Sequence, residues 1–111
     1  GKRNGKGKEY DYKGKLKFEG EYLNGERYGK GKEYDYDGEL KYEGEYLNGE
    51  RNGKGKVYYY NNNLKFEGEY FNGKVWNGKG YNINGKNDFI INNGNGKGKE
   101  YNKYGKLIYE G

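Results

Sequence analysis

The sequence predicts an all-β fold, an antiparallel meander of β-hairpins that forms one elongated single-sheet repeat solenoid. Three observations support this prediction: a segment of ten residues recurs every 24 residues, apolar and charged residues alternate within it, and an Asn-Gly step closes it. Alternation with period two indicates a strand with one buried and one solvated face. A helical period of 3.6 residues is absent from the pattern, and the 23 glycines oppose helices.

The recurring segment, Leu-Lys-Phe-Glu-Gly-Glu-Tyr-Leu-Asn-Gly, begins at Leu16 and returns with small changes at Leu40 and Leu64. Within it, the leucine, the two aromatic residues and the central glycine point to one face, and the lysine and glutamates point to the other. The short connections make neighbouring strands in sequence neighbours in space. Such units add in one direction, as in a quasi-one-dimensional repeat protein.

A second strand is expected after each Gly-Lys-Gly, over residues 32–36 and 56–60, and Asn-Gly or Asp-Gly steps supply the tight turns. Gly-Lys-Gly begins at positions 5, 29, 53, 78 and 96, so its steps are 24, 24, 25 and 18. The second strand has a phase mismatch, because Tyr34 and Tyr36 share the parity of Lys30 and Lys32. We expect a bulge or kink near the glycines to re-aim this strand.

The whole chain, residues 1–111, is predicted to be one repeat array. Residues 1–15 end an earlier unit, 16–39 and 40–63 are regular copies, 64–88 are a modified copy, 89–106 are a shortened one, and 107–111 open another. Both ends fall inside a unit, so we expect a segment of a longer array with an open strand edge at each end. Such edges pair with other chains.

Equivalent positions on the apolar face combine aromatic residues with a glycine. A side chain at that glycine would collide with a neighbouring ring, so we expect rings to lie over bare backbone and stack into a spine. The expected spine consists of Phe18, Gly20, Tyr22, Tyr42, Gly44, Tyr46, Phe66, Gly68 and Tyr70.

The string from Gly14 to Gly31 resembles a MORN repeat (membrane occupation and recognition nexus), through its Phe-Glu-Gly-Glu-Tyr core, its Asn-Gly and its Gly-Lys-Gly. The resemblance covers nearly the whole chain and departs at 74–92, and the period is one residue longer than in the most familiar form. It implies a solenoid of stacked hairpins with scaffolding, dimerisation or membrane-proximal roles, phosphoinositide binding in some members, and no catalysis. It also implies a cytoplasmic location near membranes or the cytoskeleton, whereas a filament would suit an extracellular one.

The composition argues against an enzyme. Ser, Thr, Cys and His are absent, so the usual nucleophiles, the usual general base and thiolate or imidazole metal sites are missing, and no cofactor is expected. Carboxylate pairs such as Glu19 and Glu21 recur in every copy beside lysines, which favours cross-strand charge pairing over a unique catalytic pair. The net charge of +5, with both signs interspersed, opposes nucleic-acid binding.

Two candidate sites remain. The Gly-Lys-Gly turns suit anions, and a row of Arg27, Lys30, Lys32, Arg51, Lys54 and Lys56 is expected to bind anionic lipid headgroups if any does. The break in the repeat offers either a larger local core or a docking or bend site at Trp76, Ile83, Phe89 and Ile91. The expected partners are other protein chains, above all copies of itself joined end to end or as a dimer, with an anionic membrane surface as the alternative and no small-molecule substrate.

Overall fold

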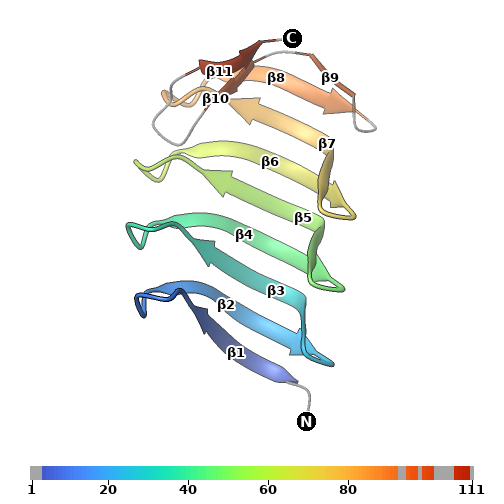
Figure 1. Cartoon of the computed structure of the whole chain (residues 1–111). Helices are drawn as coiled ribbons and strands as arrows, with labels where there is room; N and C mark the ends of the chain where they lie inside the picture. Colours follow the sequence, from blue (N-terminus) through green and yellow to red (C-terminus); the bar gives the residue numbers. More distant parts are fainter. Residues whose placement is uncertain (1–3, 93–94, 98, 102–106, 111) are drawn as a thin grey trace.

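The computed structural model describes residues 4–92, 95–97, 99–101 and 107–110, and in that part the chain is entirely β. Nine strands follow one another in chain order across a single antiparallel sheet, and two more form a separate pair (Figure 1). The strands are β1 (Gly5–Tyr10), β2 (Leu16–Leu23), β3 (Glu26–Tyr34), β4 (Leu40–Leu47), β5 (Glu50–Tyr58), β6 (Leu64–Phe71), β7 (Lys74–Tyr81), β8 (Asn87–Asn92), β9 (Asn95–Lys97), β10 (Lys99–Tyr101) and β11 (Leu107–Glu110). The predicted meander is confirmed.

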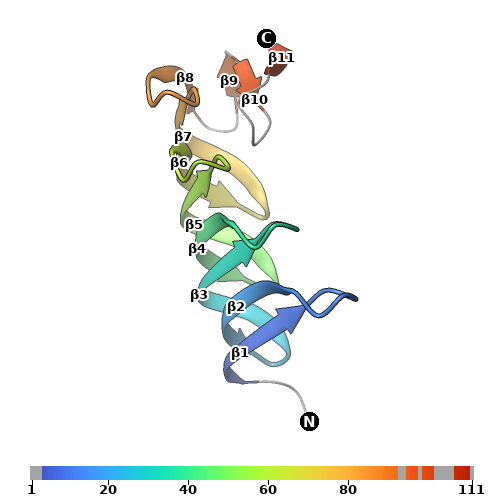
Figure 2. The ribbon, with the colours of Figure 1, turned by 90° about the vertical axis from the view of Figure 1, so that its left-hand side faces the viewer.

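The molecule is elongated because each hairpin contacts only its neighbours. Its principal extents are 45 × 31 × 17 Å, and the long axis runs across the strands. Viewed from the side, the ribbon is curved rather than flat (Figure 2). A single curved sheet has no second layer to cover it, so its core must lie on one face of the sheet itself.

Two kinds of turn alternate along the edges of the sheet. At one edge, Asn24, Asn48 and Asn72 have φ near +50° and each is followed by a glycine at φ 84°, the left-handed pair that a two-residue hairpin turn requires. At the other edge, the Asp35 carboxylate accepts hydrogen bonds from the backbone N–H groups of Asp37 and Glu39. Asp11 and Asn82 do the same in their own turns.

A bulge lies near the glycines of the second strand, but it does not re-aim that strand. Gly31 pairs with Gly20 while Tyr28 pairs with Glu21, so two extra residues are looped out on β3. Two residues preserve the alternation, and Tyr34 therefore stays on the charged face, where its hydroxyl donates to Glu19. The expectation of a re-aimed strand was wrong, because the positions that face the core on β3 belong to Arg27, Gly31 and Glu33 rather than to tyrosines.

The modified third copy shifts its register. Gly55 on β5 pairs with Gly44 on β4. Gly68 on β6 is the equivalent of Gly44 in the next repeat, and it pairs with Gly78. Gly78 is therefore the counterpart of Gly55 and not of Gly53, to which the Gly-Lys-Gly spacing assigned it. Trp76 is the one looped-out residue here, between Val75 and Asn77, so the bulge has shrunk by one residue.

Candidate functional site: the aromatic spine and its ionic braces

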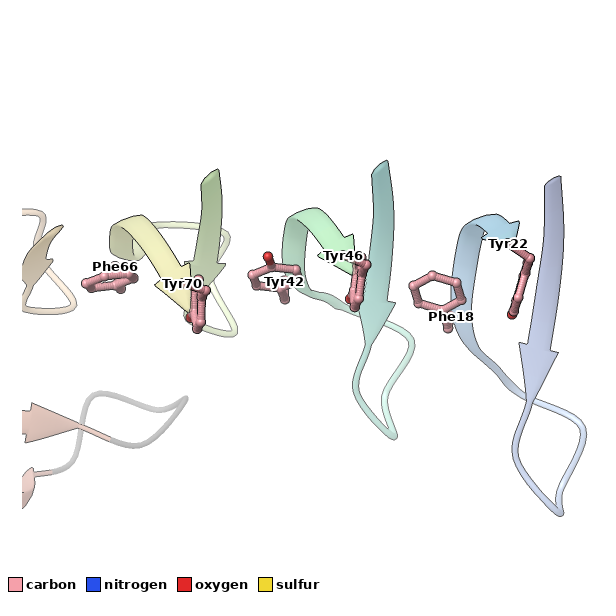
Figure 3. Packing of buried hydrophobic residues seen from close by; sticks show 6 residues of the cluster. All are labelled: Phe18, Tyr22, Tyr42, Tyr46, Phe66 and Tyr70. Carbon is pink, nitrogen blue, oxygen red and sulfur yellow. The ribbon is translucent and has the colours of Figure 1, made fainter. Parts of the chain in front are cut away.

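The core of the sheet is a continuous row of six aromatic rings, here called the aromatic spine (Figure 3). Each ring meets the next edge to face, with centroids 5.1–5.9 Å apart and planes 82–89° from parallel. Electrostatics of the ring faces and edges favours this arrangement. In spatial order the spine is Tyr22, Phe18, Tyr46, Tyr42, Tyr70 and Phe66, and none of the six is more than 6% exposed.

Glycines form the floor beneath these rings. A Cβ built on Gly31 would lie 2.6 Å from Cζ of Phe18 and 3.0 Å from Cε1 of Tyr46. A Cβ on Gly44 would lie 2.5 Å from the Tyr42 hydroxyl and from the Lys54 carbonyl oxygen. The rings therefore rest on bare backbone, and the strands beneath them approach closely because both members of each facing pair are glycine.

The upper side of the rings is covered by two ion pairs that the sequence did not reveal, here called the Glu–Arg braces. Arg27 donates to both carboxylate oxygens of Glu9, at 2.8 and 3.1 Å, and its guanidinium lies 4.1 Å from the Phe18 ring centroid. One repeat further on, Arg51 donates to Glu33 at 2.9 and 3.0 Å and lies 4.1 Å from the ring of Tyr42. Each brace joins strands of successive hairpins and sandwiches a ring between guanidinium and glycine.

A spine tyrosine completes each brace. Tyr22 donates its hydroxyl hydrogen to Glu9 at 2.7 Å, and Tyr46 donates to Glu33 at 2.5 Å. Hydrogen bonds from Arg27 hold the pKa of Glu9 below its usual range, although burial opposes this. Burial raises the pKa of Glu33, but the hydrogen bonds from Arg51 and Tyr46 outweigh it, and the net pKa is lowered. Both carboxylates are thus held ionised, and burial together with Glu33 raises the pKa of Tyr46.

The third repeat replaces the whole brace with two valines. Val57 stands 24 residues after Glu33, Val75 stands 24 residues after Arg51, and both pack against the spine. Val57 lies opposite Phe66 and Val75 lies opposite Tyr70. The two positions have changed together from a charge pair to an apolar pair. Comparing positions 9, 33 and 57 with 27, 51 and 75 would have revealed the brace in the sequence.

The opposite face of the sheet carries the charges. An open groove of about 1360 Å³ runs across it, with the glycines as its floor. Strands β1, β3, β5 and β7 contribute lysines to its walls and β2, β4 and β6 contribute glutamates, so the sign of charge alternates from strand to strand. Seven lysines and six glutamates line it, which leaves the groove almost neutral.

Several of these glutamates have local partners. Glu19 and Glu67 accept hydrogen bonds from the hydroxyls of Tyr34 and Tyr81, at 2.5 and 2.6 Å, and Glu43 accepts one from Tyr58. Burial, followed by the bond to its glutamate, raises the pKa of Tyr34 to about 12. Glu21 and Glu45 accept the backbone N–H groups of Lys30 and Lys54, which fixes the bulges.

The structure separates the six cations of the expected anion-binding row. Arg27 and Arg51 lie on the aromatic face, where the braces engage them. Lys30, Lys32, Lys54 and Lys56 are exposed on the other face, and all four line the groove. There, Lys32 lies opposite both Glu19 and Glu43. An extended anion along the groove would therefore contact a strand that carries glutamates beside every strand that carries lysines.

The expected docking residues do not gather at one place either. Trp76 is 42% exposed and lies against Phe71, with ring centroids 5.8 Å apart, at the edge that carries the Asn-Gly turns. Ile83 lies in a turn at the opposite edge, where its carbonyl accepts a hydrogen bond from Asn63. Ile91 packs against the spine and pairs with Gly78, so it stands where a glycine would stand in an earlier repeat. The side chain of Phe89 lies outside the described residues.

Across the described residues, no three Asp or Glu side chains gather so as to hold a metal ion. The same residues include no helix with the length and hydropathy that a membrane span needs. The Glu–Arg braces occur in two successive repeats and the tyrosine–glutamate hydrogen bonds in three, so repetition characterises the main polar contacts of both faces.

The family model described as MORN repeat matches the chain three times, over residues 1–15, 18–40 and 42–64, which together make up more than half of its length. The matched part contains both Glu–Arg braces and the first four rings of the spine. No curated protein matches the chain.

Proposed function

Because the chain belongs to the MORN-repeat family, whose repeats are generally scaffold modules for interaction with proteins or membranes, we propose that it is a non-catalytic scaffold that acts through contacts with other protein chains, including end-to-end self-assembly. Its surfaces suit this role. From β1 to β6 the lysines and glutamates that line the groove are repeated at a fixed spacing, as a rod that positions partners requires.

The observation that supports this proposal is the register of the last hairpin. Lys99, Glu100 and Tyr101 of β10 pair with Glu110, Tyr109 and Leu107 of β11. In the first hairpin, Lys8, Glu9 and Tyr10 pair with Glu19, Phe18 and Leu16, in the same order and with the same irregularity before the last pair. β11 is thus a strand of the β2 type.

Inside the sheet, a strand of the β2 type pairs with the strand that follows it in the chain. β3 pairs with β2 through Gly31, Lys32 and Glu33, and the counterparts of these residues on β1 are Gly7, Lys8 and Glu9. β1 is the first strand of the described sheet, and β2 is its pairing partner there. We infer that β11 of one copy adds to the outer edge of β1 of another, since it brings Tyr109 to the position that Phe18 occupies inside the array.

Sedimentation velocity over a rising concentration series, with electron microscopy of the products, tests the proposal. The 111-residue chain should associate into species that lengthen with concentration. Tyr109→Asp should abolish this association, because it places a carboxylate where the row of rings would continue. Tyr12→Asp is the matched control, since Tyr12 is 90% exposed in a turn, and it should associate like the parent chain. A parent chain that stays monomeric throughout would refute end-to-end assembly.

Binding to anionic lipid is the competing expectation. Co-sedimentation with vesicles that contain a phosphoinositide, against vesicles of neutral lipid alone, decides it at two salt concentrations. The near-neutral groove and the engaged arginines favour no binding. Salt-sensitive binding that Lys30→Gln and Lys54→Gln remove together, and that neutral vesicles lack, would favour the lipid function over the scaffold.

A further inference from the structure

Along β1–β7, successive hairpins are joined at three junctions that are held in two chemically different ways. The first two carry the Glu–Arg braces, and the third carries the Val57–Val75 pair. We propose that this difference is an acid-sensitive device: in acid the N-terminal hairpins (β1–β4) open first, while the hairpins joined through the two valines (β5–β7) stay closed.

The groups around each brace carboxylate set its response to acid. Glu33 on β3 faces Arg51 on β5, Tyr46 on β4 and, more distantly, Arg27 on its own strand. Of these groups, the two arginines are cationic and the tyrosine is a neutral donor. Glu9 on β1 is surrounded in the same way, by Arg27 on β3 and by Tyr22 and Lys17 on β2. A proton on Glu33 therefore leaves the partly buried guanidinium of Arg51 without its hydrogen-bonded counter-ion. A proton on Glu9 leaves Arg27 with only the more distant charge of Glu33.

The direction of the effect follows from linkage. The pKa of each brace carboxyl is lowered in the folded chain. Its contribution to stability is therefore complete above the pKa of the unfolded chain, which is near that of an ordinary Glu, about 4.3. It is lost as the pH falls from there through the folded value. Neutral pH keeps both braces closed, and acid opens them.

The valine junction has no such response, because neither of its side chains titrates. Among the described residues, Tyr70 has no glutamate partner of the brace type. Burial raises its pKa, and the Arg51 guanidinium, 5.6 Å from its ring centroid, opposes this. On the charged face, Glu21 and Glu45 also accept backbone N–H groups in the bulges of the first two junctions, whereas the bulge of the third junction is one residue shorter. Glu19, Glu43 and Glu67 accept the same tyrosine hydrogen bond in all three repeats, so these bonds do not distinguish the junctions.

Repeat architecture allows such a local response to become a local opening. Each hairpin contacts only its neighbours, so stability is approximately a sum over repeats and their junctions, and one end can open while the other remains folded. The order of opening then follows the chemistry of the junctions rather than their distance from an end.

Hydrogen exchange of backbone amides, corrected for the intrinsic pH dependence and compared at pH 7 and pH 3, tests the device in the 111-residue chain. Protection in β2–β4 should fall more than protection in β6 and β7, because only the braces lose an ionised carboxylate in acid. Acid titration followed by circular dichroism, on the parent chain and on variants, supplies a second measurement.

Two paired variants exchange the two kinds of junction. V57E/V75R introduces a carboxylate opposite Phe66 and a guanidinium opposite Tyr70, as in the earlier repeats, so β6 and β7 should become as acid-sensitive as β2–β4. E33V/R51V should make the second junction insensitive to acid and move the acid midpoint to lower pH. In this variant Arg27 would remain beside Tyr46, as Arg51 lies beside Tyr70 in the parent chain. Equal loss of protection along the parent chain at pH 3, or an acid midpoint and exchange profile that V57E/V75R leaves unchanged, would overturn the proposal.

Discussion

Gly31→Ala measures how strongly the spine depends on its glycine floor. The new methyl carbon would lie 2.6 and 2.7 Å from ring carbons of Phe18 and 3.0 Å from a ring carbon of Tyr46, with no backbone atom among the three nearest. Carbon atoms pack at about 3.5–4.0 Å, so the rings must move by about 1 Å. Overpacking of this kind costs about 1–3 kcal/mol, and the reduced freedom of the unfolded chain returns about 0.4–1 kcal/mol.

A double-mutant cycle assigns the cost to the ring. Phe18→Leu shortens the side chain above Gly31, so the double variant Gly31→Ala/Phe18→Leu should be more stable than the sum of the single effects predicts, by about 1 kcal/mol or more. Gly44→Ala provides the contrast, because its methyl group would also lie 2.5 Å from the Lys54 carbonyl oxygen and 2.6 Å from Cα of Gly55. These are backbone atoms, so Tyr42→Leu should rescue Gly44→Ala far less.

Urea unfolding followed by circular dichroism measures each corner of the cycle through the midpoint and slope of the transition. Gly49→Ala is the control for backbone strain, because its φ is 84° and its methyl group would meet no atom within 4 Å. It should cost about 1 kcal/mol for reasons unrelated to the rings. If the effects of Gly31→Ala and Phe18→Leu simply add, the ring does not rest on that glycine and the reasoning about the spine is refuted.

Three further predictions concern pH and turns. The pKa values of Tyr34 and Tyr58 are raised to about 12. Their contribution to stability should therefore be complete below about pH 10 and lost as the pH rises through 12. In an alkaline titration, Tyr34→Phe/Tyr58→Phe should not show this loss of stability. Asn48→Ala should cost about 1 kcal/mol in urea unfolding because Asn48 has φ 52°, whereas Asn48→Gly should be nearly neutral, and equal costs would contradict the assignment to φ. Asp35→Ala should cost about 1 kcal/mol because it removes two hydrogen bonds from turn N–H groups. Asp35→Asn should retain most of the stability, since the Asn82 side chain accepts the equivalent two hydrogen bonds in its own turn.

The sequence predicted the fold class, the first strand of each unit and the Asn-Gly turns well because each depends on local chemistry. The second strand was predicted too late, over residues 32–36 and 56–60: β3 and β5 span Glu26–Tyr34 and Glu50–Tyr58, with Gly-Lys-Gly inside the strand and not in a turn. Strict alternation places Phe18 and Tyr22 on one face, and Asn-Gly steps supply the positive φ that short hairpins need. The family resemblance is confirmed by the matches over residues 1–64. The positions of the expected spine residues follow from the same alternation, repeated three times in register.

The braces could not be recognised in this way because Glu33 and Arg51 are 18 residues apart and their types are common on surfaces. Their pairing depends on the two-residue bulge, which brings Arg27 opposite Tyr22 and Gly31 opposite Gly20 at once. The frame of the third copy was misassigned for a related reason. Gly78-Lys79-Gly80 repeats the letters of Gly53-Lys54-Gly55 25 residues later, but the bulge is one residue shorter, so the structural counterpart of Gly78 is Gly55, 23 residues earlier.

A chain so poor in aliphatic residues would be expected to remain disordered, and the geometry of the spine explains why this one folds. Each ring meets its neighbours edge to face, the rings of Phe18, Tyr42, Tyr46 and Phe66 lie against glycines, and two of the rings also carry a guanidinium above them. Aromatic contacts of this kind contribute about 0.5–1.5 kcal/mol each beyond the buried area. Glycine and arginine usually weaken a hydrophobic core, but here glycine backbone lies beneath the rings and arginine side chains cover them. The valine junction shows that the enclosure, rather than the charge, is what the fold requires, since Val57 and Val75 cover the spine where the third brace would be.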